Sequence, residues 1–208
     1  MTRFPRVPLR TLMLVAACAV AALGGAWVAA TFWAQAHPTT EAAAVYDQPR
    51  PIPEFALVAH DGSRFDRARL LGHYSFVFFG YTNCPAFCPA TLAELAAAMK
   101  DVAPARRPEV VFVSVDPARD TPEVLARYVA HFDPRFVGAT GTDEALGTLA
   151  AALGAAYQRE APVDGSYAVE HTSALFLIDP DARLAAVFPA PHAAKTLAAD
   201  YLKIRGRR

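Results

Sequence analysis

Two apolar stretches separated by a helical pattern constrain the fold of this chain most. Tyr74–Phe79 (YSFVFF) and Glu109–Val115 (EVVFVSV) are runs of aromatic and β-branched residues. Such runs are typical of strands that are buried on both faces of a parallel sheet. Between them, Thr91–Val102 has apolar residues at helical spacing, and Pro89 suits the first turn of a helix. The pattern therefore predicts a strand–helix–strand unit.

The remaining elements extend this unit into the thioredoxin-like order. Thr121 followed by Pro122 is a strong signal for the start of a helix. In chain order we expect a β-hairpin at Glu54–Val58 and Ser63–Phe65, a helix from Pro122 to about His131, a short strand at Phe136–Ala139, a helix capped by Thr142 and ending at Leu153, a loop at Gln158–Glu170, a hairpin at Ser173–Ile178 and Leu184–Phe188, and a closing helix at Pro191–Ile204. The predicted fold class is α/β: a thioredoxin-like fold with an N-terminal β-hairpin extension.

Thr11–Trp33 contains no charged residue and predicts a single transmembrane helix before the domain. At about 1.5 Å per residue, this segment can cross a hydrocarbon core of about 30 Å. Arg3, Arg6 and Arg10 precede it, so the positive-inside rule places the N-terminus in the cytoplasm. We expect residues 1–10 to be cytoplasmic, 11–33 to be the anchor, 34–53 to be a Pro-rich and Ala-rich linker, and 54–208 to be the domain.

Two forms of cleavage are alternatives to this anchor. Ala34-Gln35-Ala36 resembles a signal-peptidase site, and cleavage there would secrete the domain to the periplasm. Val15–Cys18 loosely resembles a lipoprotein cleavage box, which would give a lipid-anchored domain. The apolar run is longer than the roughly 7–15 residues of a signal-peptide core and continues beyond Cys18, so we favour the uncleaved anchor. The leader is of a bacterial type, which favours a bacterial inner membrane with the domain in the periplasm.

The charge balance excludes one class of partner. The chain has 20 basic and 20 acidic residues, so it has no net charge that would favour nucleic acid.

Cys84 and Cys88 are the only cysteines outside the N-terminal segment, and three functions are open to them. A structural disulfide is permitted in an exported domain, although so short a loop gives little stabilisation. Thiol–disulfide exchange fits a pair near a helix N-terminus, but its usual motif has two intervening residues instead of three. Metal binding needs at least one further ligand.

His171 is the candidate for that ligand. It precedes the hairpin strand that is expected to run antiparallel beside the first core strand, so the topology brings it to the edge of the sheet that carries Cys84 and Cys88. Two thiolates and one imidazole are a soft, three-coordinate set that suits copper, whereas zinc would require a fourth ligand. This placement favours metal binding over the two other functions.

Four stretches of the sequence carry a resemblance to a known family. They are FGYTNCPAFCP at 79–89, VSVDPARDTP at 113–122, GATGT at 138–142 and VEHT at 169–172. In this order they resemble the SCO/SenC copper chaperones of cytochrome c oxidase assembly, and the similarity extends from about Pro53 to the C-terminus. Many members of that family have an acidic residue where this chain has Ala86, which is not a ligand position.

The resemblance implies a function. It implies that the domain binds one copper ion through Cys84, Cys88 and His171 and delivers it to the CuA site of cytochrome c oxidase subunit II. It also implies that Cys84 and Cys88 are a redox-active pair, since some members are described as reducing the cysteines of that site. The favoured function is therefore a metallochaperone, which is not an enzyme. The alternative is an extracytoplasmic thiol–disulfide oxidoreductase. Other copper chaperones and thioredoxin-like reductases are further expected partners.

Asp116 and Tyr81 are candidates for supporting the metal site. Asp116 ends the second buried strand and therefore lies at the same edge of the sheet. It can orient His171 or tune the thiols, or it can cap the turn that follows. Tyr81 adjoins the cysteine loop and can shield a metal there. Arg119 and Asp120 are expected to form a surface turn or a docking pair.

Overall fold

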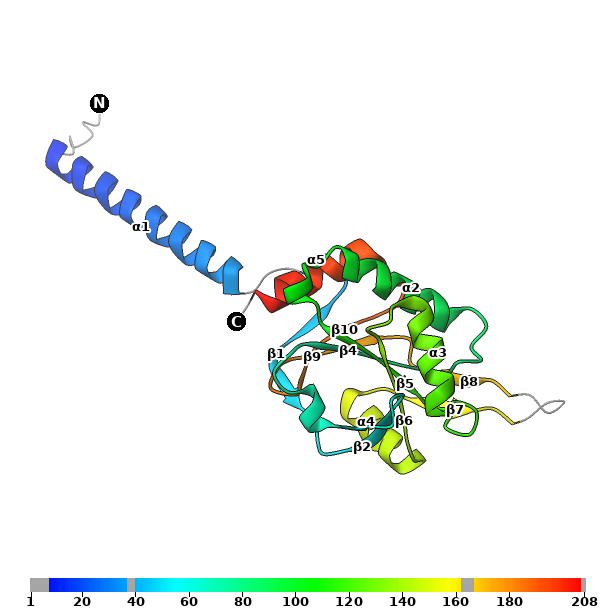
Figure 1. Cartoon of the computed structure of the whole chain (residues 1–208). Coiled ribbons are helices and arrows are strands. Elements are labelled where there is room, and N and C mark those ends of the chain that lie inside the picture. Colours follow the sequence, from blue (N-terminus) through cyan, green and yellow to red (C-terminus); the bar gives the residue numbers. More distant parts are fainter. Residues whose placement is uncertain (1–7, 37–39, 162–166, 207–208) are drawn as a thin grey trace. The chain divides into compact units, whose positions relative to one another are not determined.

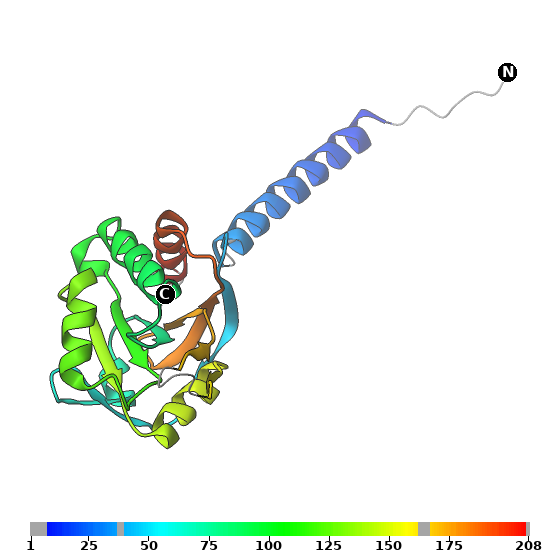
Figure 2. The same cartoon turned by 90° about the vertical axis from the view of Figure 1, so that its right-hand side faces the viewer.

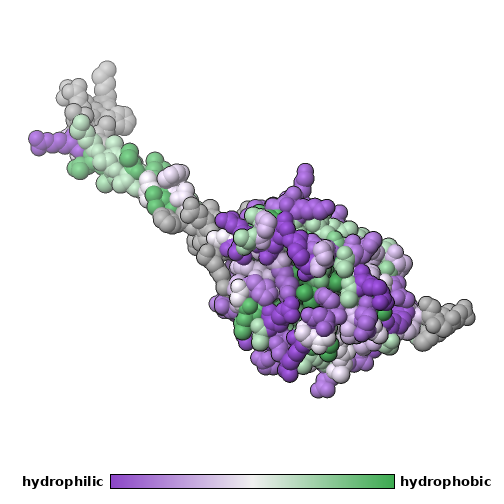
Figure 3. Space-filling model, in the orientation of Figure 1, coloured by the Kyte–Doolittle hydropathy of each residue, from purple (hydrophilic) through white to green (hydrophobic). Residues whose placement is uncertain are grey.

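The computed structural model describes residues 8–36, 40–161 and 167–206, which belong to two separate units. The first unit contains helix α1 (Leu9–Ala36), as expected for the predicted anchor. Its segment Met13–Thr31 is long and apolar enough to cross a membrane. Figure 3 shows apolar colour along this helix, which is compatible with a membrane anchor. Orientation and cleavage of the segment stay predictions.

The second unit, Thr40–Ile204, is built on one mixed sheet of eight strands. Their order across the sheet is β1-β10-β9-β4-β5-β6-β2-β3. The strands are β1 (Ala44–Pro51), β2 (Ala56–Ala59), β3 (Arg64–Asp66), β4 (Ser75–Gly80), β5 (Glu109–Ser114), β6 (Val137–Thr140), β9 (Leu175–Ile178) and β10 (Arg183–Phe188). Strands β4, β5 and β6 are parallel, and β9 runs antiparallel to β4, as the sequence predicts.

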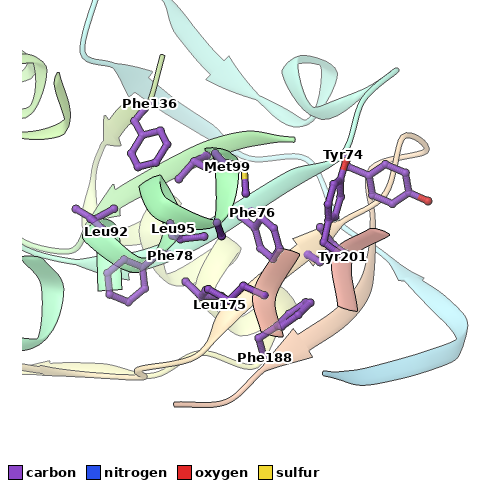
Figure 4. Close-up of a cluster of buried hydrophobic side chains, with 14 of the residues drawn as sticks. Tyr74, Phe76, Phe78, Leu92, Leu95, Met99, Phe136, Leu175, Phe188 and Tyr201 are labelled. Atoms are coloured by element: carbon purple, nitrogen blue, oxygen red, sulfur yellow. The ribbon is translucent and has the colours of Figure 1, made fainter. Parts of the chain in front are cut away.

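Alternation along β4 assigns the two faces of the sheet to two cores. Phe76 and Phe78 point to one face, where they pack with α2 (Phe87–Lys100), α3 (Pro122–Phe132) and α5 (Ala194–Arg205). Figure 4 shows the aromatic and aliphatic side chains of this core. Val77 and Phe79 point to the other face, towards α4 (Asp143–Leu153). Figures 1 and 2 show the resulting three layers of helix, sheet and helix.

The helix starts follow from local chemistry. Thr121 caps α3 by accepting a hydrogen bond from the Val124 N–H, and Thr142 caps α4 in the same way. Helix α2 begins at Phe87, two residues before the expected start at Pro89. Pro89 is tolerated as the third helical residue because N–H groups of the first turn have no partner within the helix. Two short 3-10 helices, η1 (Arg67–Leu70) and η2 (Pro104–Arg106), complete this part of the fold.

The predicted linker is wrong over Ala44–Pro51, which forms strand β1. This strand pairs antiparallel with β10, with an irregular register between Val45 and Arg50. Proline is tolerated in an edge strand, so a Pro-rich composition does not exclude pairing there. The domain therefore begins near Thr40 instead of Glu54. The part of the linker at residues 37–39 lies outside the described residues.

The predicted loop at Gln158–Glu170 is wrong at both ends. Strands β7 (Tyr157–Arg159) and β8 (Val169–His171) pair antiparallel as a two-stranded ribbon. Residues 162–166, between them, lie outside the described residues. His171 is the last residue of β8, so it belongs to this ribbon and not to the strand of the main sheet that follows.

Asp200 on α5 fixes the start of the domain. Its carboxylate is fully buried and accepts hydrogen bonds from the N–H groups of residues 41, 42 and 43. Burial alone would raise the pKa of Asp200, yet these donors and Lys203 hold the pKa below its usual value. Because the folded pKa is depressed, the carboxylate stabilises the fold above the unfolded pKa, and this stabilisation is lost as the pH falls through the folded value.

We predict that Asp200→Asn lowers the free energy of unfolding by about 1–3 kcal/mol at pH 7, because the charged acceptor of three N–H groups is lost. Below about pH 4 the difference from the parent should shrink, since the parent carboxyl also becomes protonated. Urea unfolding of the full chain in detergent at pH 7 and pH 3, followed by circular dichroism, measures this. The exposed Asp101 supplies the control Asp101→Asn, which should change little. An equal loss at both pH values would contradict the role of the charge.

Candidate metal centre

Cys84, Cys88 and His171 come together at the end of β4. Cys84 lies in the loop that follows this strand, Cys88 in the first turn of α2, and His171 at the end of β8. Their sulfur and nitrogen ligand atoms all lie within 4.8 Å of one another. Cys88 is buried, and the two other residues are half-buried. The structure thus brings together the three residues that the sequence singled out, although His171 lies 83 positions beyond Cys88 in the chain.

The imidazole of His171 is oriented for a ligand role. Its Nδ1 lies 3.1 Å from the carbonyl oxygen of Thr172, and its Nε2 lies 3.3 Å from Cys88 Sγ. A carbonyl oxygen only accepts, so Nδ1 carries the proton and Nε2 presents its lone pair to the cysteines. Burial lowers the pKa of His171, which favours the neutral form that a metal requires.

Three aromatic rings surround this imidazole. The ring centroids of Phe78, Tyr81 and Phe87 lie 6.0, 6.1 and 6.2 Å from that of His171, all in edge-to-face arrangements. Edge-to-face pairs fix ring orientation as well as burying apolar area. Phe78 and Tyr81 are buried, whereas Phe87 is 37% exposed and forms the outer side of the enclosure. With these neighbours the His171 side chain is half-buried.

The two thiols differ in their surroundings. The half-buried Cys84 accepts a hydrogen bond at Sγ from the backbone N–H of Cys88 at 3.4 Å. Burial raises the pKa of the Cys88 thiol, which favours its protonated form in the metal-free protein. Both cysteines are free thiols in the structure.

Asp120 is a site residue that sequence reasoning missed. The sequence predicts Asp120 in a surface turn or a docking pair, but its side chain is fully buried. Its carboxylate accepts from the Thr82 N–H at 2.9 Å, from the Thr82 hydroxyl at 2.6 Å and from the Ser114 hydroxyl. Asp120 therefore ties the start of the cysteine loop to the end of β5. Thr82 follows β4 closely and Ser114 ends β5, and these two hydroxyl groups beside buried strands were the available signal for a buried acceptor.

Tyr81 lies against His171, whereas the Asp116 carboxylate is bonded to residues outside the cluster. The buried Asp116 carboxylate accepts from the Tyr167 hydroxyl at 2.6 Å and pairs with Arg119. Tyr81 packs its ring on His171, and the Arg119 guanidinium lies 5.7 Å from the Tyr81 ring centroid. Arg119 therefore contacts both Asp116 and Tyr81, in contrast to the surface turn or docking pair that the sequence predicts.

The family model for SCO1/SenC matches residues 44–205, nearly the whole second unit. The chain belongs to the SCO1/SenC family. A curated relative is the mitochondrial protein SCO1 homolog 1 of Arabidopsis thaliana, which is 35% identical over 61% of this chain. The match covers 39% of that protein, so the chain spans less than half the length of this relative.

Solved Sco structures share the fold. The solution structure of apo Sco1 from Thermus thermophilus superposes with a TM-score of 0.70 at 33% identity, covering 79% of this chain and 95% of that one. Arabidopsis thaliana ScoI with copper bound superposes with a TM-score of 0.69 at 31% identity, covering 74% of this chain and 97% of that one. These neighbours confirm the prediction of a thioredoxin-like fold of the SCO/SenC type.

Gly80, the last residue of β4, provides the space that Cys88 occupies. A Cβ at this position would lie 2.8 Å from Cys88 Sγ and 2.6 Å from the ring of Phe112. Both neighbours are fully buried, so neither can move without disturbing the core.

We therefore predict that Gly80→Ala lowers the free energy of unfolding by about 1–3 kcal/mol through overpacking. Gly147 is the matched control, because it lies inside α4 with no atom within 4 Å of an added Cβ. Gly147→Ala should be neutral or stabilise by up to about 1 kcal/mol. Chemical unfolding of both variants measures the contrast, and a stable Gly80→Ala protein would show that the Cys88 sulfur has room to move.

Proposed function

We propose that this protein binds one copper ion through Cys84, Cys88 and His171. The observation that carries the proposal is the convergence of two sulfurs and one nitrogen within 4.8 Å. Membership of the SCO1/SenC family and the likeness to copper-bound Arabidopsis ScoI support it.

The donor set favours copper over other metals. Two thiolates and one imidazole are soft ligands, and such a set satisfies Cu(I) with three bonds. A structural zinc site would require a fourth ligand. The carbonyl oxygen of Thr172 accepts a hydrogen bond from Nδ1 of His171, an arrangement that is common for metal-bound imidazoles.

We further propose that the protein is a membrane-anchored copper chaperone, with cytochrome c oxidase subunit II and its CuA site as the client. Helix α1 supports the anchor, and the SCO/SenC resemblance supports the client. In this proposal the N-terminus is cytoplasmic and the domain faces the periplasm of a bacterium. Upstream copper chaperones that load the site, and reductases that keep its thiols reduced, are the complementary partners.

The first prediction of this proposal concerns copper itself. The reduced full chain in detergent should bind one equivalent of Cu(I), and His171→Ala should weaken binding by more than about tenfold, because one of three ligands is removed. Competition with a coloured Cu(I) chelator measures the affinity. Oxidation of Cys84 and Cys88 to a disulfide should abolish binding, since it removes both thiolates.

A matched control uses the half-buried His60, whose Nδ1 accepts from the Gly138 N–H in another part of the sheet. His60→Ala should retain the parent affinity. The copper assignment fails if the parent does not bind stoichiometrically, or if His171→Ala and His60→Ala behave alike.

The second prediction concerns the client. Cells that carry Cys84→Ser or Cys88→Ser should lose most cytochrome c oxidase activity, because the protein can no longer carry copper to the CuA site. Adding excess copper to the medium tests whether the loss reflects delivery. Full CuA loading in both variants without added copper would exclude the role in oxidase assembly.

One observation favours thiol–disulfide exchange as a second candidate function. Cys84 is accessible and Cys88 is buried, an asymmetry that suits an attacking thiol and its resolving partner. The two functions make different demands on His171, because copper binding needs its Nε2 and disulfide exchange does not. Reductase activity that survives His171→Ala would support the second candidate.

A further inference from the structure

His171 lies on an element that stands apart from the main sheet. Strands β7 and β8 pair only with each other within the described part of the chain. Cys84, in contrast, lies in the loop after β4, and Cys88 lies in the first turn of α2 and belongs to the buried core. The distance from His171 Nε2 to the two sulfurs therefore depends on contacts outside the main sheet.

The side chains that contact the segment before β8 belong to the turn that follows β5. Arg119 donates from Nη1 to the carbonyl oxygen of Tyr167 at 3.1 Å, and its guanidinium lies 3.7 Å from the centroid of the Tyr167 ring. The hydroxyl of Tyr167 donates to Asp116 Oδ1 at 2.6 Å, and Asp116 Oδ2 pairs with Arg119 Nε. The backbone, the ring and the hydroxyl of Tyr167 are thus all held by two side chains of one turn.

Tyr167 lies two residues before the start of β8 and four residues before His171. Arg119 also approaches Tyr81 at 5.7 Å, and the ring of Tyr81 packs edge-on against His171. The same guanidinium therefore contacts the segment that carries the imidazole and an aromatic ring that orients it. Asp116 is fully buried, so its negative charge requires the donors that Tyr167 and Arg119 supply.

We propose that Asp116, Arg119 and Tyr167 form a clamp that positions His171 over Cys84 and Cys88. The three are positioning residues, because they act on the metal site through the ribbon and Tyr81. The inference rests on the proposed copper-binding function, and it adds the residues that determine the strength of the third ligand.

The ribbon has a second attachment that keeps it folded when the clamp is cut. Arg159 on β7 donates from Nη2 to the carbonyl oxygen of Val115 at 2.7 Å and pairs with Asp143 on α4. The side chain of Val169 is buried in the core. Loss of the clamp should therefore loosen the position of His171 without unfolding the domain.

Two conservative variants test the clamp in the full chain. Arg119→Lys keeps the charge but loses the planar fork and the stacking, and Tyr167→Phe keeps the ring but loses the hydroxyl bond to Asp116. Both should retain the parent melting temperature within a few degrees and bind Cu(I) about 10-fold to 100-fold more weakly, as changes outside the ligand shell do. In a His171→Ala background neither should weaken binding further, because the clamp acts only through that imidazole.

Arg183→Lys is the matched control. Arg183 pairs with the buried carboxylate of Asp179 at 2.9 Å, and this pair lies at the opposite end of β9 from His171. The same chemical change at that site should leave copper affinity at the parent value.

A measurement on the copper-free protein separates this inference from the proposed function. Nuclear Overhauser contacts between the His171 ring and the rings of Phe78 and Phe87 should be present in the parent and in Arg183→Lys, and weakened in Arg119→Lys and Tyr167→Phe. A parent that binds no copper but shows this pattern would refute the function and keep the clamp. Unchanged ring contacts, parent-like copper affinity in both clamp variants, or an equal loss of affinity in the His171→Ala background would overturn the clamp.

Discussion

The pairing of β4 on both sides determines where chemistry can occur in this domain. Its parallel pairing with β5 places the ends of both strands at one edge of the sheet, and its antiparallel pairing with β9 brings the start of β9 to that edge. All six residues of β4 are buried, so the register is fixed by packing on both faces. The loop with Cys84, the turn with Asp116 and the segment after His171 converge for this reason.

Buried carboxylates then fix the irregular segments that the sheet does not reach. Asp120 holds the start of the cysteine loop, Asp116 holds the approach to β8, and Asp200 holds the entry into β1. A buried carboxylate is costly unless donors satisfy it, so each one admits few arrangements of the surrounding chain. In this domain, buried carboxylates fix the conformations of the loops, while the two apolar cores fix the packing of helices on the sheet.

Much of this architecture could be predicted from the sequence, because it depends on signals that act locally. The buried runs that became β4 and β5, the caps Thr121 and Thr142, and the antiparallel placement of the hairpin strand before Ile178 were sufficient to bring His171 to the cysteines. Edge strand β1 was missed because it includes proline and its partner β10 is distant in the chain. Ribbon β7–β8 was missed because each of its strands has only three residues, most of them polar. Asp120 was missed because a DP-x-x-D turn looks the same on a surface as in a core, and only tertiary packing buries it.

The three ligand atoms consequently differ in what holds them. Cys88 belongs to the helix-covered core, and Cys84 is placed by the loop that Asp120 secures, so moving either sulfur would disturb buried packing. His171 is held by aromatic edges, by the Thr172 carbonyl and by a ribbon outside the main sheet. The position of the imidazole therefore depends on contacts outside the main sheet, whereas the positions of the two sulfurs depend on the core and the loop beside it. If the proposed copper site is occupied, the two sulfurs would supply ligands held by the core, and the imidazole would be the ligand whose position the clamp sets.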